Sequence, residues 1–148
     1  MKKLFVNYEI AILLKEKGFN ENCLGTYLTN KSVKEGKFYP AEPNCDITDE
    51  FDSDGYLNFV VIKNSDLEDV PQYAAAPLYQ QVIDWFRKVH KIEVNPCKVK
   101  SLDCYHFYVY PVKDGKCAID WTEVMPVSAF DTYEEARIKA IEKALTYI

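Results

Sequence analysis

The chain has 148 residues, of which 48% are hydrophobic and 28% charged, and its formal net charge is −5. These proportions exclude an intrinsically disordered chain, and a sequence of this length supplies one ordinary hydrophobic core. The acidic balance provides no general attraction for phosphates, so we expect no nucleic-acid partner. Asn7, Tyr8 and Glu9 break the apolar N-terminal stretch, and nothing approaches the roughly 18 apolar residues of a membrane span. We therefore expect a cytoplasmic protein without a membrane partner.

The N-terminal part of the chain predicts one helix and one strand. Apolar residues at helical spacing predict a helix over residues 7–17, with Asn7 as its N-cap and Gly18 as the residue that ends it. The stretch CLGTYLT then predicts a strand over residues 23–29.

Residues 38–62 form an acidic and irregular segment in this reading. No lysine or arginine lies between Lys37 and Lys63, while the segment holds two prolines and six acids. Long irregular segments of small domains tend to be functional or disordered, so the segment is either a contacting surface or a solvated loop. Its Asp-Gly pair leads into YLNFVVI, which predicts a strand over residues 56–62.

The clearest helical pattern is APLYQQVIDWFRKVHKI, which predicts a helix over residues 77–90. Pro77 suits the first helical position, because the N–H that proline lacks would have no partner within the helix there. His90 ends the helix, where a cationic imidazole would interact favourably with the last carbonyl groups. The expected apolar stripe consists of Leu78, Val82, Trp85, Phe86 and Val89.

The C-terminal part of the chain predicts three strands and a helix. The strands cover residues 91–99, 102–112 and 117–124, and the Asp-Gly pair of KDGK predicts a hairpin turn between the last two. The closing helix is expected to begin at Asp131, with Glu134 completing a capping box. Its expected buried face consists of Tyr133, Ala136, Ala140, Ile141, Ala144, Leu145 and Ile148.

The predicted elements follow the order α-β-β-α-β-β-β-α, with hairpins in place of regular alternation. Strands and helices segregated in this way predict an α+β fold. We expect a two-layer structure in which three helices pack on a largely antiparallel sheet of about five strands. The whole chain, 1–148, is expected to form a single domain.

Three stretches carry a resemblance to known proteins: NYEIAILLKEKGF, APLYQQVIDWFRKVHKI and FDTYEEARIKAIEKALTYI. Together they resemble a group of small uncharacterised proteins of Bacteroidetes bacteria and of their phages and mobile elements. The resemblance implies a bacterial cytoplasm and a phage or mobile-element accessory role. It implies no catalytic residues, because these stretches hold packing residues.

The stretch DEFDSDGYLNFV has the appearance of a calcium-binding loop. With Gly55 as the sixth loop residue, Glu50, Asp52 and Asp54 fall on the first, third and fifth positions. The twelfth position requires a bidentate Glu but is Val61, and a strand follows in place of a second helix. The pattern therefore favours a turn before a strand, with a weak Ca²⁺ or Mg²⁺ site at Asp52 and Asp54 as the alternative.

The cysteines are odd in number and include no CxxC pair, which predicts reduced thiols in the absence of a secretion signal. They are Cys23, Cys45, Cys97, Cys104 and Cys117. In a regular strand Cys104 and His106 share one face, with Cys97 and Cys117 on the flanking segments. These four side chains are candidate zinc ligands, although knuckle-type ligand pairs are more closely spaced than Cys97 and Cys104. The alternative is that the thiols act as small buried hydrophobes.

Cys104 and His106 also form a candidate pair of nucleophile and base. Side chains two residues apart on one strand face are near enough to approach each other. A catalytic pair of this kind usually needs a third residue that orients the base, and the sequence names none.

The sequence contains no nucleotide-binding or hydrolase motif, and it is rich in aromatic residues, with 11 Tyr, 8 Phe and 2 Trp. Such a content is typical either of a sheet with half-buried tyrosines whose hydroxyls reach water or of a contact surface, since Tyr and Trp are enriched at protein interfaces. We therefore expect a non-catalytic protein that binds a protein partner or forms a homodimer, without a cofactor. The expected contact residues are Tyr108, Tyr110, Trp121, Glu50, Asp52 and Asp54.

The alternative function is that of a small hydrolase or nuclease-like enzyme that uses a divalent metal ion. Carboxylates of the acidic segment, Asp52 and Asp54, would then converge with Asp120 or Glu123 to hold the ion.

Overall fold

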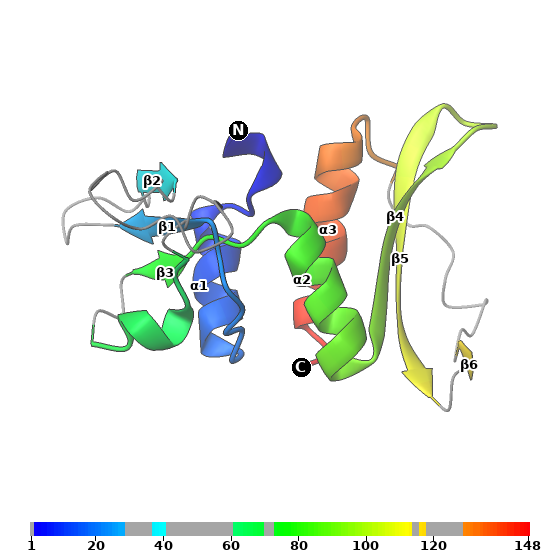
Figure 1. The fold of residues 1–148 in the computed structure, drawn as a ribbon. Helices are drawn as coiled ribbons and strands as arrows, with labels where there is room; N and C mark the ends of the chain where they lie inside the picture. The colour runs from blue at the N-terminus through cyan, green and yellow to red at the C-terminus, as the bar shows by residue number, and fades with distance from the viewer. Residues whose placement is uncertain (1, 29–36, 41–60, 70–72, 114–115, 118–128) are drawn as a thin grey trace, which may run out of the picture. The chain divides into compact units, whose positions relative to one another are not determined.

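The computed structural model describes residues 2–28, 37–40, 61–69, 73–113, 116–117 and 129–148 (Figure 1). The chain divides into two compact units, an N-terminal unit, Met1–Tyr79, and a C-terminal unit, Gln80–Ile148. The fold is α+β, with three α-helices and antiparallel strand pairing, as the sequence predicts. The strands belong to two sheets rather than one, and the expectation of a single domain stays a prediction. No helix in the described ranges combines the length and apolar character that crossing a membrane requires.

The N-terminal unit contains one α-helix and a small sheet. Its elements are the 3-10 helix η1 (Lys2–Leu4), α1 (Tyr8–Glu16), β1 (Gly25–Leu28), β2 (Lys37–Pro40), the 3-10 helix η2 (Asn64–Leu67) and β3 (Ala74–Ala75). The sheet has the order β2-β1-β3, and both pairs are antiparallel. Asn7 is the N-cap of α1, because its side chain accepts a hydrogen bond from the Ile10 amide at 2.9 Å. Gly18 follows the helix with a φ of 83°, which glycine adopts without steric cost. Both end signals are confirmed.

The strand β2 lies in the segment that the sequence analysis treats as irregular. Lys37–Pro40 pairs along the whole of β1, with Phe38 opposite Tyr27. The two rings contact each other at a centroid distance of 5.6 Å, so an aromatic cross-strand pair stabilises the extended backbone. The predicted strand 56–62 lies mostly outside the described residues, because residues 41–60 are not described. At its end, Ile62 forms an isolated antiparallel bridge with Cys23.

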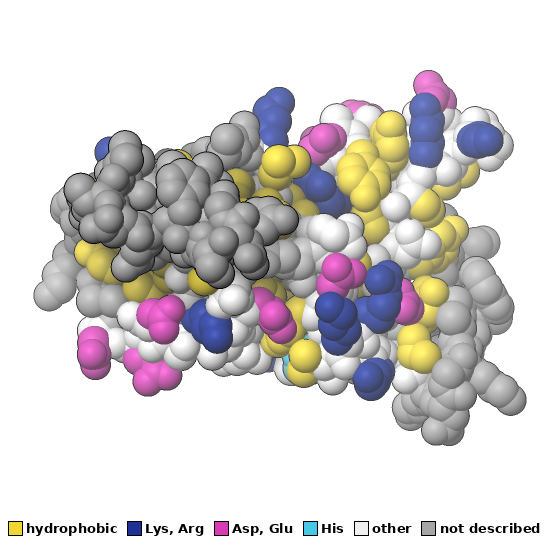
Figure 2. Space-filling view, viewed as in Figure 1, with side chains coloured by type: hydrophobic (Ala, Val, Ile, Leu, Met, Phe, Trp, Pro, Cys, Tyr) yellow, Lys and Arg dark blue, Asp and Glu magenta, His cyan; other side chains and the backbone are white. Residues whose placement is uncertain are grey.

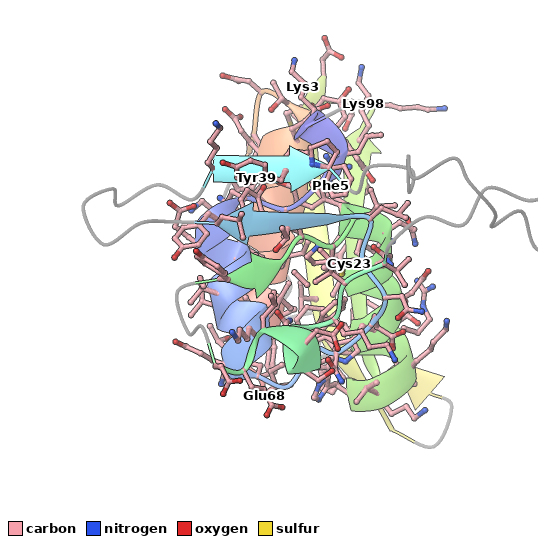
Figure 3. All side chains as sticks on the ribbon, turned by 60° about the vertical axis from the view of Figure 1, so that its left-hand side comes forward. Lys3, Phe5, Cys23, Tyr39, Glu68 and Lys98 are labelled. Atoms are coloured by element: carbon pink, nitrogen blue, oxygen red, sulfur yellow. The ribbon has the colours of Figure 1, made fainter. Side chains whose placement is uncertain are left out.

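An aromatic cluster forms the core around β1. The Tyr27 ring is buried, its hydroxyl donates a hydrogen bond to the Val6 carbonyl, and burial raises the pKa of Tyr27 to about 12. Phe5 lies against β2, with its ring 4.7 Å from that of Phe38 (Figure 3). The Phe38 ring also covers Gly25, where an added Cβ would lie 2.7 Å from a ring carbon. A larger residue at position 25 would therefore displace the Phe38 ring.

Two polar side chains hold η2 in place. Asn64 is buried, its Nδ2 donates to the Phe19 carbonyl at 2.7 Å, and its Oδ1 accepts from the Ala75 amide at 2.9 Å. Lys15 of α1 donates through Nζ to the Leu67 carbonyl at 2.7 Å and to a second carbonyl at 2.9 Å. Burial lowers the pKa of Lys15. Because Asn64 is buried, its two hydrogen bonds satisfy a donor and an acceptor that would otherwise lose their bonds to water at a cost in stability.

The C-terminal unit contains a hairpin packed by the closing helix. Its elements are α2 (Tyr79–Trp85, shared with the first unit), the π-helical turn η3 (Phe86–His90), β4 (Ile92–Val99), β5 (Cys104–Lys113), β6 (Lys116–Cys117) and α3 (Tyr133–Leu145). The sheet has the order β4-β5-β6 and is antiparallel (Figure 1). The predicted strands 91–99 and 102–112 are thus confirmed to within two residues. Of the predicted strand 117–124, the structure describes Cys117 alone.

The predicted helix 77–90 is present as α2 and η3 and ends at His90 as predicted, but it begins two residues later and its last turn is π-helical. The Pro77 carbonyl accepts from the Val6 amide at 3.1 Å and Leu78 forms a bridge with Phe5, so these two residues are used for strand-like pairing. The π-helical turn then adds a residue to the helical period, which rotates the following side chains. As a result Val89 is 57% exposed, whereas Phe86 is buried.

His90 is not a cationic cap. Its ring packs edge-on against Trp85 at a centroid distance of 4.4 Å, and its Nε2 is buried without a hydrogen-bond partner among the described residues. Burial lowers the pKa of His90, so the neutral imidazole is favoured. The capping role belongs to Lys91, whose Nζ donates to the Lys88 carbonyl at 2.8 Å and whose φ of 57° ends the helix.

The helix α3 begins one residue later than predicted. Thr132, and not Asp131, is the N-cap, because its hydroxyl accepts from the Glu135 amide at 3.2 Å. The buried face is confirmed for the small and aliphatic residues Ala136, Ala140, Ile141, Ala144 and Leu145. Tyr133 is 39% exposed, contrary to the prediction, because it occupies the first helical position, at the rim of the packed surface.

We predict that Asn64→Asp destabilises the N-terminal unit by at least about 2 kcal/mol at pH 7. The substitution replaces the donor to the Phe19 carbonyl with a carboxylate oxygen and buries a charge. Urea unfolding followed by circular dichroism measures the effect. Part of the loss should be recovered in acid, where a protonated carboxyl can donate to the same carbonyl. The control is Asn20→Asp, which keeps its exposed acceptor for the Ser65 amide and should shift the free energy of unfolding by less than about 0.5 kcal/mol. Equal effects of the two substitutions would contradict the account.

We also predict that His90 titrates below its ordinary pKa of 6.5. The folded pKa lies below the unfolded one, so the stability that neutral His90 contributes is complete above pH 6.5 and is lost as the pH falls through the folded pKa. Proton NMR of the imidazole measures the midpoint directly. In a Trp121→Phe background, fluorescence of Trp85 should fall over the same range, because the imidazolium quenches the adjacent indole. A midpoint at or above 6.5 would show that the ring is not desolvated as described.

Candidate functional site

One face of the β4–β5 hairpin carries α3. Side chains alternate along each strand, so Ile92 and Val94 share a face, and both are buried. On β5 the same face carries Tyr105, whose ring lies 6.1 Å from that of Tyr133 at the start of α3. Since α3 packs on both strands, this face belongs to the core of the C-terminal unit.

The opposite face gathers the residues that the sequence analysis singles out. We call it the tyrosine face, and it consists of Glu93, Asn95, Cys97 and Val99 of β4 and Cys104, His106, Tyr108 and Tyr110 of β5. Asn95 lies directly opposite Tyr108, Glu93 opposite Tyr110, and Cys97 opposite His106. Tyr108 and Tyr110 are both half-buried, so part of each side chain is exposed.

The thiol of Cys104 contacts the imidazole of His106. The distance from Sγ to Nε2 is 3.6 Å, as expected for neighbours on one strand face. His106 is 3% exposed and is thus held within the structure, whereas Cys104 is half-buried. Cys104 is also the first residue of β5. It follows Asp103, which has a φ of 47° in the hairpin turn. The Asp103 carboxylate forms a salt bridge with Lys98 at 2.8 Å.

The neighbouring thiols have different surroundings. Cys97 faces His106 across the ladder and is half-buried, and burial raises its pKa. Cys23 of the N-terminal unit is fully buried, and burial raises its pKa to about 12. All three described cysteines are free thiols. Among them Cys104 combines partial exposure with an adjacent base.

The structure tests the predicted zinc ligands in part. Cys104 and His106 share one face, as predicted, and Cys97 lies opposite His106 on that face, but no group of three or more His, Cys, Asp or Glu side chains in the described ranges is placed to hold a metal ion. The backbone of Cys117 pairs with Val112, and its side chain lies outside the described residues. A zinc site that includes Cys117 therefore stays a prediction.

The remaining predicted residues lie outside the described part of the chain. They are Glu50, Asp52 and Asp54 of the acidic segment, Trp121, and the carboxylates Asp120 and Glu123. The weak calcium or magnesium site and the metal-dependent hydrolase both depend on these residues, and both stay predictions.

The outer edge of β4 is protected against strand addition. The Val112 amide donates to the Lys91 carbonyl, so residues 91, 93, 95, 97 and 99 direct their backbone groups toward β5. The backbone nitrogen of Pro96 is therefore directed away from β5, toward the edge that no described strand pairs with, and its missing N–H removes a donor there.

Sequence reasoning missed an ion pair at one end of the tyrosine face. Arg87 of η3 donates through Nε to both carboxylate oxygens of Glu93, at 2.8 and 3.0 Å, and a second nitrogen contacts Asp84 at 3.3 Å. The hydrogen bond to Glu93 and the two nearby carboxylates raise the pKa of Arg87. No helical spacing links positions 87 and 93, because the chain reverses at Lys91 between them. The left-handed turn at Lys91 has no glycine to signal it.

Comparison with known proteins found no family model, no curated sequence and no solved structure that matches this chain. The resemblance to small phage and mobile-element proteins therefore stays a prediction.

Proposed function

We propose that this chain is a non-catalytic cytoplasmic protein that acts by protein binding, and that the tyrosine face forms the contact. The observation that carries the proposal is the pair Tyr108 and Tyr110, which are half-buried on the face of the hairpin opposite α3. Tyrosine contributes a large apolar contact area and a hydroxyl at a small cost in conformational entropy, and is enriched at interfaces for this reason.

The hairpin favours contact through its face rather than its edge. Strand addition would need a row of free N–H and C=O groups along β4, and Pro96 interrupts that row. A partner that packs on the face instead meets side chains, among which the tyrosines provide the largest apolar area. The Arg87 to Glu93 ion pair adds a polar rim at one end of the face, a common arrangement in protein interfaces.

The charge distribution favours a second copy of the chain as the partner. The N-terminal unit has eight Lys and Arg against thirteen Asp and Glu, which accounts for the whole net charge of −5. The C-terminal unit has ten of each and is neutral. Figure 2 shows basic and acidic side chains side by side over α2 and η3. Two C-terminal units can therefore approach without net repulsion, whereas two N-terminal units repel each other.

The experiment is sedimentation velocity over a range of protein concentrations. The wild-type chain should shift from monomer toward dimer as concentration rises. Replacing both tyrosines, Tyr108→Thr with Tyr110→Thr, keeps a residue with high strand preference but removes the rings. This double variant should weaken association by at least about 2 kcal/mol, a roughly thirtyfold rise in Kd.

The matched control is Tyr147→Thr. Tyr147 is 48% exposed beyond the end of α3, where its ring contacts Lys143, and lies away from the tyrosine face. This variant should associate like the wild type. A wild-type chain that stays monomeric up to about 1 mM, or equal losses in the control and the double variant, would refute self-association through this face.

A further inference from the structure

We propose that Cys104 and His106 form a reactive thiol site, in which His106 acts as the base and the thiol reacts with small peroxide oxidants. Both side chains lie on the tyrosine face, so the test uses protein dilute enough to be monomeric, and the proposal does not depend on self-association.

The geometry of the strand creates the pair. Cys104 and His106 are two residues apart on β5 and project from the same face, and the Sγ to Nε2 distance of 3.6 Å allows a thiol hydrogen bond to the ring nitrogen. His106 is held by burial, with 3% of its surface exposed, so the imidazole stays beside the sulfur. The neighbouring strand adds to this restraint, because Cys97 pairs with His106 in the ladder.

The position of Cys104 allows a small molecule to reach the sulfur. Cys104 is half-buried and is the residue that follows the turn between β4 and β5. Of the other two described thiols, Cys23 is fully buried, and Cys97 is half-buried but lies within β4, whereas Cys104 begins its strand beside the turn. A thiol needs both access and a nearby base or cation to react quickly, and Cys104 has both.

The reaction is a two-electron oxidation by hydrogen peroxide. As Sγ attacks one peroxide oxygen, its proton passes to Nε2 of His106, an S–O bond forms and the O–O bond breaks. The departing hydroxide takes the proton from the imidazolium and leaves as water. Cys104 becomes a sulfenic acid, the peroxide is reduced to water, and His106 returns to its neutral form.

The test measures the oxidation of each cysteine in the full-length chain after treatment with a metal chelator. Hydrogen peroxide is added with dimedone, which traps sulfenic acids, and peptide mass spectrometry gives the rate at every cysteine. In the wild type Cys104 should react at least about tenfold faster than Cys97, which serves as the reference on the same face. In His106→Asn the rate at Cys104 should fall about tenfold, a larger fall than at Cys97.

Two outcomes would overturn the proposal. One is a wild-type chain in which Cys104 reacts no faster than Cys97. The other is a folded His106→Asn variant, checked by circular dichroism, in which Cys104 keeps its rate, which would assign the reactivity to exposure alone. If His106→Asn fails to fold, His106→Gln gives the same comparison with a longer amide side chain.

Discussion

The register of the β4–β5 ladder decides which side chains of the C-terminal unit can meet. Cys97 lies opposite His106 and Asn95 opposite Tyr108, so every second residue of the hairpin belongs to the tyrosine face. A slip of one residue in one strand would reverse the face of all its side chains and place His106 against α3. The packing of α3 opposes such a slip, because Ile92 and Val94 would then leave the core and expose apolar surface.

The same ladder limits how the unit can contact a partner. A face with half-buried tyrosines and an outer edge that carries Pro96 leave face-to-face packing as the favoured mode of association. The charges agree with this, since the acidic excess lies entirely in the N-terminal unit. The N-terminal unit depends on a different set of constraints, an aromatic cluster around Tyr27 and the buried amide of Asn64, which fix its short strands.

Local signals in the sequence predicted much of this structure. Asn7 and Gly18 bound α1 because capping and a positive φ depend on single residues, and the alternation along β5 correctly placed Cys104 and His106 on one face. The errors arose where distant contacts override local preference. Leu78 pairs with Phe5, seventy-three positions away, and this pairing delays the start of α2. A π-helical turn, which has no sequence signature, exposed Val89 and brought His90 against Trp85. The described strands form two sheets because of pairings between residues far apart in the chain, and the pattern within a single strand does not specify its partner.

The most direct measurement of this account is the set of cross-strand nuclear Overhauser effects between α-protons of the β4–β5 hairpin. In an antiparallel ladder the residues of non-hydrogen-bonded pairs have the closest α-carbons, about 4.5 Å apart. The account predicts strong effects for Val94 with Val109 and for Pro96 with Phe107. Strong effects shifted by one residue, such as Val94 with Tyr108, would place His106 and both tyrosines on the α3 side and would contradict the site, the proposed interface and the reactive thiol together.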